Sequence, residues 1–365
     1  MDLAAAYASD VTGDTTNEII VTLVQTESKI QSMGGYPLSS MLVFIVGCVD
    51  NQFHMLFQNK LADVVNAPRS PSGVLRIEDL NADGLREIVF AYLMDRGLYD
   101  DYWQAEMLEW NGSSFRALLP AAQENPIPGY PSGPASPIAT NADPEFRDVD
   151  GNGTIEILFP DRPLHHHCDD GPWRVTKSIY MWDGEFYRYM WTDPGSPNYR
   201  FEAAFDGDYF TLAGLYDKAE ASYLRAVHDK NLPAFDYSQW SEKALNVGCW
   251  GDYSDPDEPY RIVAYARLRL LELFAFLDRQ NDAKADWEYL RTHYSEKTAG
   301  YVYAALAKTF WDSYSAGGDI KSACAAVRDQ SEANQNDIFG PMGPYGYNSL
   351  YLTPKTICPF PSVAD

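Results

Sequence analysis

The chain has 365 residues and a mass of 41.0 kDa, with 52 acidic against 28 basic side chains and a formal net charge of -24. Such a chain repels phosphate backbones and anionic headgroups, which argues against nucleic acid and acidic membrane surfaces as partners and favours cations. Its 45% of hydrophobic and 14% of aromatic residues exclude a disordered acidic tail, and its length predicts two or three domains.

The first residues lack the basic region and the apolar stretch of a signal peptide. The longest apolar run, residues 41–49, is far shorter than the roughly 18 residues of a membrane span and predicts a buried strand. Because the first recognisable motif begins only at Asp10, we expect a leader to have been removed just upstream.

Three segments of the chain align without gaps, and their first aspartates are evenly spaced by 69 residues at Asp10, Asp79 and Asp148. Equal spacing predicts three copies of one structural unit. The expected units lie near residues 1–69, 70–138 and 139–200.

Each segment has the donor pattern of a calcium loop. Oxygen-bearing side chains recur at positions 1, 3, 5 and 9, and position 7 offers its backbone carbonyl, an all-oxygen set that suits Ca²⁺ better than zinc or copper. In the first copy Thr12 replaces a stronger ligand and Thr15 replaces the glycine of position 6, so we expect two Ca²⁺ sites and a weaker third. The predicted ligands, in the order of positions 1, 3, 5, 7 and 9, are Asp79, Asn81, Asp83, Leu85 and Glu87 in the second copy, Asp148, Asp150, Asn152, Thr154 and Glu156 in the third, and Asp10, Thr12, Asp14, Thr16 and Glu18 in the first.

Each unit also contains two short apolar segments joined by a turn, at Asp50-Asn51, Asn111-Gly112 and Asp183-Gly184. The Asn-Gly and Asp-Gly pairs indicate type I′ hairpins, in which both central residues need positive φ. Trp110 and Trp182 precede the later two turns, where we expect packing rather than ligand binding. A metal loop, a strand and a hairpin make about one four-stranded blade.

The Asp-x-Asp/Asn-x-Asp-Gly-x-x-Glu loops followed by strands resemble the FG-GAP or VCBS calcium-binding repeats of integrin-like β-propellers, over residues 1–200. The resemblance implies three antiparallel β-propeller-type blades with structural Ca²⁺, and adhesive or scaffolding extracellular roles. Propellers usually have about four to eight blades. The array is therefore open, contains a degenerate fourth blade, or is completed by neighbouring chains.

After Pro197 the alternation of strands gives way to helical periodicity, which predicts an α-helical domain over residues 201–340. The fold class is thus multidomain, β and then α. The spacing of Gly214, Ala219, Tyr223 and Ala226 resembles a tetratricopeptide repeat (TPR), a class that binds proteins or peptides on a concave surface, and a generic helical domain is the alternative. Similar spacings occur at Gln280, Ala285, Tyr289 and Leu290 and at Gly318, Ala323 and Val327, with partner helices expected at 261–277 and 301–314. Residues 125–144 are expected to be a linker, and 341–365 a Pro-rich C-terminal tail.

None of the five cysteines forms a C-x-x-C pair, which argues against zinc ribbons and thioredoxin chemistry. Cys48 lies in the apolar run and is predicted to be a buried free thiol. We expect Cys358, in the Pro-rich tail, to pair with Cys324, which leaves Cys168 to pair with Cys249 by elimination. Either bond would indicate an oxidising compartment.

The sequence contains no P-loop, strand-linked G-x-G-x-x-G, H-E-x-x-H or G-x-S-x-G signature, so we expect no enzyme. One cluster, His165-His166-His167 with Asp169, could hold a transition metal if extended, since alternate residues share a face. A polar loop between blades is the simpler interpretation.

Together these patterns predict a non-enzymatic, extracellular or cell-surface calcium-binding scaffold or adhesion protein that contacts other proteins. One alternative is a self-assembling subunit of an extracellular filament, in which open blade edges or the tail of one copy complete the next. Another is a glycan-binding or glycan-processing module, suggested only by the aromatic content.

Overall fold

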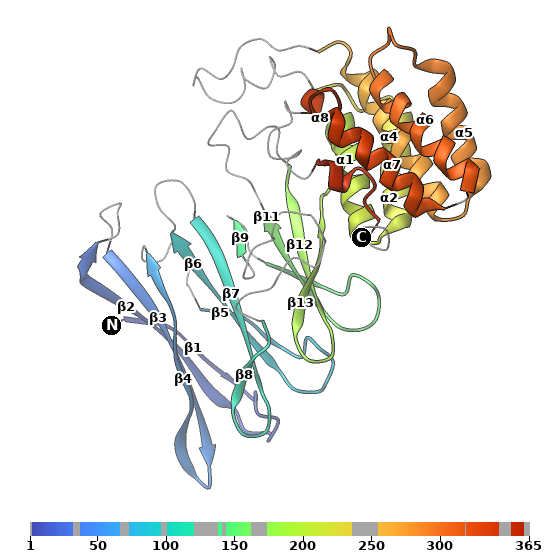
Figure 1. Ribbon diagram of the computed structural model, residues 1–365. Helices are drawn as coiled ribbons and strands as arrows, with labels where there is room; N and C mark the ends of the chain where they lie inside the picture. The colour runs from blue at the N-terminus through green and yellow to red at the C-terminus, as the bar shows by residue number, and fades with distance from the viewer. Residues whose placement is uncertain are drawn as a thin grey trace. The chain divides into compact units, whose positions relative to one another are not determined.

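The structure is a computed structural model that describes residues 2–31, 37–65, 73–95, 101–119, 138–140, 144–161, 174–235, 255–317, 319–342 and 352–360. The chain divides into two compact units, of which the first takes most of the residues up to Asp193 and the second takes Pro194–Asp365 with two short earlier segments. The predicted order of strands followed by helices is confirmed (Figure 1). Among the described residues, no helix has the length and apolarity that a membrane span requires.

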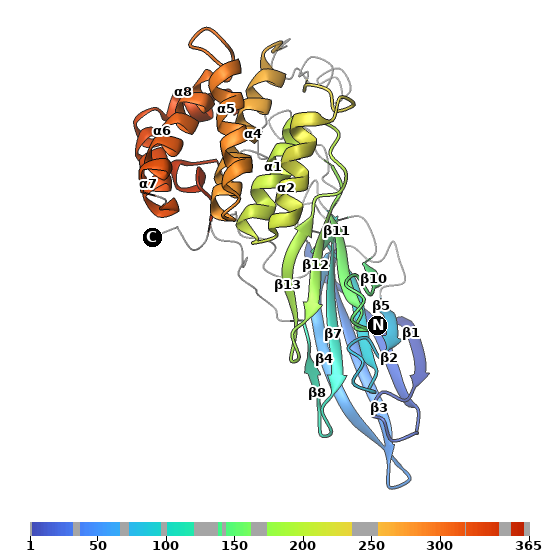
Figure 2. The same cartoon turned by 90° about the vertical axis from the view of Figure 1, so that its right-hand side faces the viewer.

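The first unit contains three antiparallel sheets, and in each the strands lie side by side in chain order (Figure 2). A motif loop joins the first two strands of every sheet and a hairpin joins the last two. The first sheet consists of β1 (Asp2–Ser9), β2 (Glu18–Gln31), β3 (Pro37–Val49) and β4 (Gln52–Val65). The middle sheet consists of β5 (Gly73–Glu78), β6 (Glu87–Asp95), β7 (Asp101–Trp110) and β8 (Phe115–Ala117), with β9 (Ile138–Thr140) paired to β7. The third sheet consists of β10 (Glu145–Arg147), β11 (Glu156–Asp161), β12 (Thr176–Trp182) and β13 (Tyr187–Asp193).

The three sheets pack face to face through two hydrophobic cores. Because successive residues of a strand point to opposite faces, β6 contributes Ile88 and Phe90 to one core and Val89 to the other. The first core joins Ile20, Val43 and Ile45 of the first sheet to Ile88, Phe90 and Leu108 of the middle sheet. The second joins Val89 and Met107 of the middle sheet to Ile157, Phe159 and Tyr180 of the third. The described strands form this stack and no closed barrel or propeller.

The three hairpins do not share one turn type. Asp50 and Asn51 both have positive φ, 52° and 61°, as a type I′ turn requires. In the later hairpins only the glycines do, Gly112 at 93° and Gly184 at 99°. There the side chains of Asn111 and Asp183 accept backbone N–H bonds from two and three residues ahead, which stabilises a longer turn. The type I′ prediction is therefore wrong for these two hairpins.

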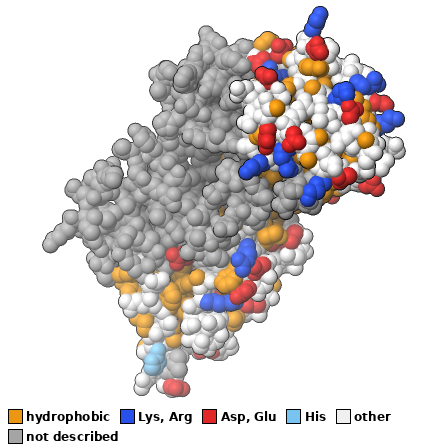
Figure 3. All heavy atoms as spheres, in the orientation of Figure 1, with side chains coloured by type: hydrophobic (Ala, Val, Ile, Leu, Met, Phe, Trp, Pro, Cys, Tyr) orange, Lys and Arg blue, Asp and Glu red, His pale blue; other side chains and the backbone are white. Residues whose placement is uncertain are grey.

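In its described part, the outer face of the first sheet exposes apolar side chains. Phe53, Met55 and Ile19 are 75%, 53% and 41% exposed. In Figure 3 hydrophobic side chains reach the surface in the lower left part of the view, where β3 and β4 run in Figure 1. Cys48 is free and half-buried on this face, so the prediction that it is buried is wrong.

The helical unit is built mainly from three pairs of consecutive helices. The two predicted partner helices correspond to the first members of the second and third pairs, α4 and α6. The described α-helices are α1 (Arg200–Leu212), α2 (Tyr216–His228), α4 (Glu258–Phe276), α5 (Gln280–His293), α6 (Tyr301–Gly317), α7 (Ile320–Ala333) and the short α8 (Gln335–Phe339), and a 3₁₀ turn, η3, covers Pro354–Thr356.

The second helix of each pair buries an alanine in its first turn. These residues are Ala219, Ala283 and Ala323, each fully buried. The sequence alignment placed the second of them at Ala285, which is exposed. A two-residue shift turns a side chain by about 200° around a helix, so the error moved the predicted contact to the opposite face.

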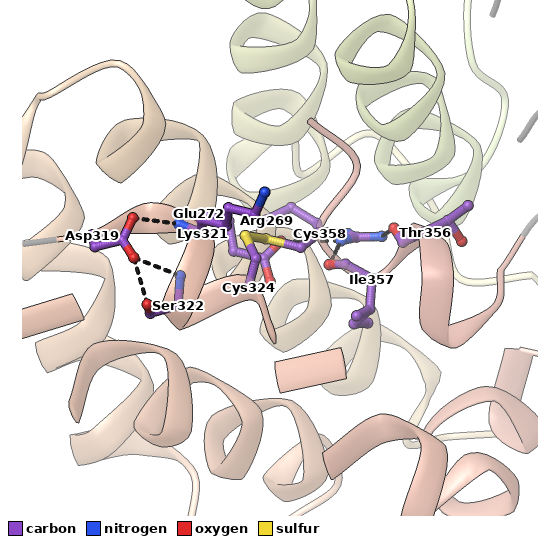
Figure 4. The surroundings of a disulfide bond; sticks show 9 residues. All are labelled: Arg269, Glu272, Asp319, Lys321, Ser322, Cys324, Thr356, Ile357 and Cys358. Carbon is purple, nitrogen blue, oxygen red and sulfur yellow. Dashed lines mark hydrogen bonds and ion pairs between the residues drawn. A yellow bond between two sulfur atoms is a disulfide. The ribbon is translucent and has the colours of Figure 1, made fainter. Parts of the chain in front are cut away.

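The C-terminal segment is attached to the helices (Figure 4). Cys324 of α7 and Cys358 lie at disulfide distance, with their Cα atoms 5.5 Å apart. Arg269 of α4 donates to the backbone carbonyls of Thr356, at 2.9 Å, and of Ile357. Cys168, Cys249, the histidine cluster and most of the predicted linker and tail lie outside the described residues.

Candidate metal sites

The three motif loops share one hydrogen-bond frame. The aspartate of position 1 accepts the backbone N–H of position 6, the side chain of position 5 accepts that of position 7, and the glutamate of position 9 accepts that of position 2. At position 1, Asp10, Asp79 and Asp148 accept from Thr15, Gly84 and Gly153, each at 3.0 Å. At position 5, Asp14, Asp83 and Asn152 accept from Thr16, Leu85 and Thr154 at 2.7, 2.8 and 2.7 Å. At position 9, Glu18, Glu87 and Glu156 accept from Val11, Leu80 and Val149 at 2.9, 2.5 and 2.5 Å.

This frame requires a left-handed residue at position 6. Gly84 and Gly153 have φ of 93° and 90° there, and Thr15 is held at 72° in the first loop. A β-branched residue in this region is strained by about 1 to 2 kcal/mol. The first loop thus keeps the backbone conformation of the others in spite of an unsuitable residue.

Consecutive loops also contact one another. Arg86, at the end of the second loop, donates to the Ser9 hydroxyl at the start of the first, at 3.0 Å. The N–H of Ile155 in the third loop donates to the Leu80 carbonyl in the second, at 2.7 Å. The loops therefore lie next to one another along the stack of sheets.

The second loop gathers three carboxylates. Asp79, Asp83 and Glu87 each place an oxygen within 4.8 Å of the other two. Asn81 accepts the Asp83 N–H at 3.0 Å through its carbonyl oxygen and donates through its amide to Glu109 of β7 at 2.7 Å. The carboxylates of positions 1, 5 and 9 thus meet in one small volume, which is the arrangement a cation needs.

Glu87 is the least satisfied of these ligands. Its side chain is fully buried, and its Oε1 has no hydrogen-bond donor among the described residues. Burial raises the pKa of Glu87 to about 8, and the nearby charges of Glu109 and Asp83 add to the rise. A buried carboxylate oxygen without a donor is costly, and a bound cation would remove that cost.

The third loop gathers Asp148, Asp150 and Glu156 within the same 4.8 Å limit. Burial raises the pKa of Glu156, and the charges of Asp150 and Asp148 raise it further. Position 5 is Asn152, whose carbonyl oxygen already accepts from the N–H of Thr154 at 2.7 Å and from its hydroxyl at 2.5 Å. The third carboxylate of this cluster therefore comes from Asp150 at position 3, because Asn152 at position 5 has no carboxylate.

The first loop differs in its side chains. Within the described ranges, the second and third loops are the only segments where three such groups meet at this distance. In the first loop, the Thr12 hydroxyl donates to Oε1 of Glu18 at 3.2 Å, while the N–H groups of Val11 and Thr12 donate to Oε2. Thr12, which replaces a ligand in this loop, thus donates to Oε1 of Glu18, whereas the equivalent Oε1 of Glu87 has no donor among the described residues.

The all-oxygen donor sets of the second and third loops can hold a hard divalent cation. The carbonyl ligands expected from Leu85, Thr154 and Thr16 stay a prediction.

Sequence reasoning missed Glu109, which is 2% exposed and ion-paired to Arg116 at 2.7 Å. Its signal was a carboxylate within the apolar run Met107-Leu108-Glu109-Trp110.

Comparisons of the chain with protein-family models, with curated proteins and with solved structures find no match.

Proposed function

We propose that this chain is a non-enzymatic calcium-binding scaffold or adhesion protein of the extracellular space or cell surface. One observation carries the proposal: loops with one hydrogen-bond frame recur at the same place in three stacked sheets, and two of them gather three carboxylates. The resemblance of the loops to FG-GAP or VCBS repeats supports Ca²⁺ as the ion. Oxygen donors on a short loop suit Ca²⁺, whose coordination is more flexible than that of Mg²⁺.

The role of the ion under this proposal is structural. A cation in each loop would neutralise carboxylates that otherwise repel one another, and it would bind the folded loops in preference to the unfolded chain. Such binding stabilises the fold by about 2.7 kcal/mol when the free ion exceeds its dissociation constant a hundredfold. Because the loops adjoin, this stabilisation would act on the contact between neighbouring sheets.

Two features of the helical unit support the remainder of the proposal. The Cys324–Cys358 pair is typical of proteins from oxidising compartments. Consecutive helix pairs with buried alanines, which resemble tetratricopeptide repeats, favour a protein or peptide partner. The glycan alternative has only the aromatic content of the chain in its support.

Calorimetric titration with Ca²⁺, combined with thermal melting before and after chelation, tests the calcium sites. We expect two ions per chain and a melting temperature that falls when the ions are removed. Asp83→Asn should remove one of the two sites, because Asp83 belongs to the second cluster. The matched control is Asp14→Asn, the same substitution at the same position of the first loop, which should leave both sites intact.

The possible results separate clearly. No heat of binding in millimolar Ca²⁺ together with an unchanged melting temperature would refute the calcium sites. Loss of a site in Asp14→Asn but not in Asp83→Asn would show that the loops have been assigned in the wrong order. Tighter binding of Mg²⁺ than of Ca²⁺ would replace the proposed ion.

A further inference from the structure

The second motif loop meets a carboxylate that comes from outside the loop. Ile88 of β6 lies opposite Leu108 of β7. The residues next to them, Glu87 and Glu109, therefore face each other on the same side of the sheet. Their side chains are 0% and 2% exposed. Like charges directly opposite each other destabilise a sheet, and burial increases the cost, so this pair calls for a compensating positive charge.

The compensation within the chain is one-sided. Glu109 accepts at Oε1 from Nε and Nη2 of Arg116, at 3.0 and 2.7 Å, and at Oε2 from the amide of Asn81, at 2.7 Å. Glu87 belongs to the carboxylate cluster of the second loop, and its buried Oε1 has no donor among the described residues. A bound cation would supply what is missing on the side of Glu87.

Glu109 also determines which end of the Asn81 side chain faces the loop. An ionised carboxylate only accepts hydrogen bonds, so it binds the NH₂ end of the amide. The carbonyl end of Asn81 then points into the loop, where it accepts the Asp83 N–H at 3.0 Å. Oxygen is the atom that a hard cation binds, so the orientation held by Glu109 is the one that a cation needs.

The other two sheets lack a carboxylate at the position of Glu109. By the same strand register, this position is occupied by Gly47 in the first sheet and by Met181 in the third. A Cβ on Gly47 would lie 3.4 Å from Cγ of Glu18, so a residue at this position does face the glutamate of the loop. Neither glycine nor methionine has a side chain that can hold an amide in place.

The residue at position 3 of the loop changes together with this strand residue. The third loop, beside Met181, has Asp150 at position 3, and Asp150 belongs to its carboxylate cluster. The second loop, beside Glu109, has the neutral Asn81. A carboxylate at position 3 of the second loop would repel Glu109, so the two loops use alternative solutions. Arg116 offsets the charge of Glu109, so the second site as a whole carries the same net charge as the third.

We propose that Glu109 is a positioning residue of the second cation site, which directs the Asn81 carbonyl oxygen to the ion and shields the site from the charge of Arg116. The inference rests on the calcium sites proposed above and extends the second of them from the loop to β7. Loss of a partner that orients a metal ligand typically lowers metal affinity about ten- to a hundredfold.

Calorimetric titration of the full chain with Ca²⁺ tests this role. The parent for all variants is Asp148→Asn, which removes a carboxylate of the third cluster so that only the second site is measured. Glu109→Met introduces the residue type of the third sheet and should weaken binding about ten- to a hundredfold. Glu109→Gln keeps an acceptor for Asn81 and loses the charge, so it should weaken binding by a smaller factor. It also allows the comparison if the methionine variant does not fold.

The matched control is Glu78→Met in the same parent. Glu78 also lies opposite Glu87 and also pairs with an arginine, Arg76 at 2.8 Å, but its side chain is 56% exposed. Exposed charges contribute little, so this variant should change the affinity by less than about fivefold.

A double variant separates positioning from a general structural role. Asn81→Asp combined with Glu109→Met gives the second loop the pair found in the third, a carboxylate at position 3 and a methionine on the strand. This variant should recover most of the affinity that Glu109→Met loses, whereas damage to the fold would not be repaired in this way. Far-ultraviolet circular dichroism verifies the fold of each variant.

The results also separate this inference from the calcium proposal. A parent that binds no Ca²⁺ would refute the second calcium site and the role of Glu109 with it. If the parent binds Ca²⁺, the role of Glu109 alone is overturned by either Glu109 variant binding as tightly as the parent, by an equally large loss in Glu78→Met, or by a double variant that stays as weak as Glu109→Met.

Discussion

Arg269 offers the sharpest test of how the helical unit is stabilised. Its side chain is 1% exposed and lies 3.0 Å from both Asp208 and Glu272, which are equally buried. It also donates to the Thr356 and Ile357 carbonyls of the C-terminal segment (Figure 4). We predict that Arg269→Met, which keeps much of the volume and removes the charge, strongly destabilises the helices.

The magnitude follows from what the substitution leaves behind. Removing one member of a buried ion pair costs about 3 to 5 kcal/mol, because the partner charge stays buried without compensation. Here Glu272 and two carbonyls would lose the donor that Arg269 provides, and Asp208 would lose its positive partner while keeping the hydroxyls of Tyr223 and Tyr265. A matched control is Arg279→Met, since Arg279 also pairs with two carboxylates, those of Glu220 and Asp282, but is 40% exposed. Exposed pairs contribute only up to about 1 kcal/mol.

Urea unfolding, followed by far-ultraviolet circular dichroism, measures both variants against the wild type. The expected result is a loss of about 3 kcal/mol or more for Arg269→Met and of less than about 1 kcal/mol for Arg279→Met. Equal losses in the two variants would show that burial of the ion pairs has no special weight, and the argument would fail.

Three further predictions concern the disulfide, pH and the first loop. Reducing the Cys324–Cys358 bond, which spans 34 residues, should cost about 4 kcal/mol of helical stability in urea titrations, by the chain-entropy estimate, and an unchanged midpoint would contradict this. Burial raises the pKa of Glu272 from 4.5 to about 7, so the native state binds a proton more tightly than the unfolded chain between these values. The free energy of unfolding should therefore fall as pH rises from about 4.5 to 7, by up to about 3 kcal/mol, and Glu272→Gln should show a flatter profile. Thr15→Gly should stabilise the first unit by about 0.5 to 1 kcal/mol, because it relieves a left-handed threonine, whereas Gly84→Thr should destabilise it by a similar amount or more.

The sequence predicted what is encoded locally. The motif loops join the first two strands of each sheet because alternating donors and small residues specify the turn within nine positions. The helices near 261–277 and 301–314 were found because apolar periodicity extends over several turns. Their exact contacts needed more, since Ala283 and Ala285 are equally plausible in sequence and only packing shows which one faces a neighbour.

Features that depend on distant partners could not be predicted. Glu109 approaches the second loop from β7, and the pairing of β6 with β7 is what brings it to Asn81. Arg269 stands in the apolar run of α4, where its burial depends on carboxylates of two helices and on carbonyls about 87 residues away. The face-to-face order of the sheets likewise depends on which side of each strand meets another sheet, whereas the strand alternation alone shows only that two sides exist.

The two units are stabilised by different chemistry, and this leads to a last prediction. In the first unit, carboxylates such as Glu87 and Glu156 converge on loops that connect strands, so removal of cations should loosen the strands beside those loops. In the second unit, Cys358 and the carbonyls bound by Arg269 attach the C-terminal segment, so reduction should loosen α7 and its neighbours.

Hydrogen exchange on the full chain can measure both units in one experiment. We expect a chelator to speed amide exchange in β6 and β11 and a reductant to speed it in α7, each without the other effect, because neither treatment touches the interactions of the other unit. Exchange that accelerates across both units under either treatment would contradict this division.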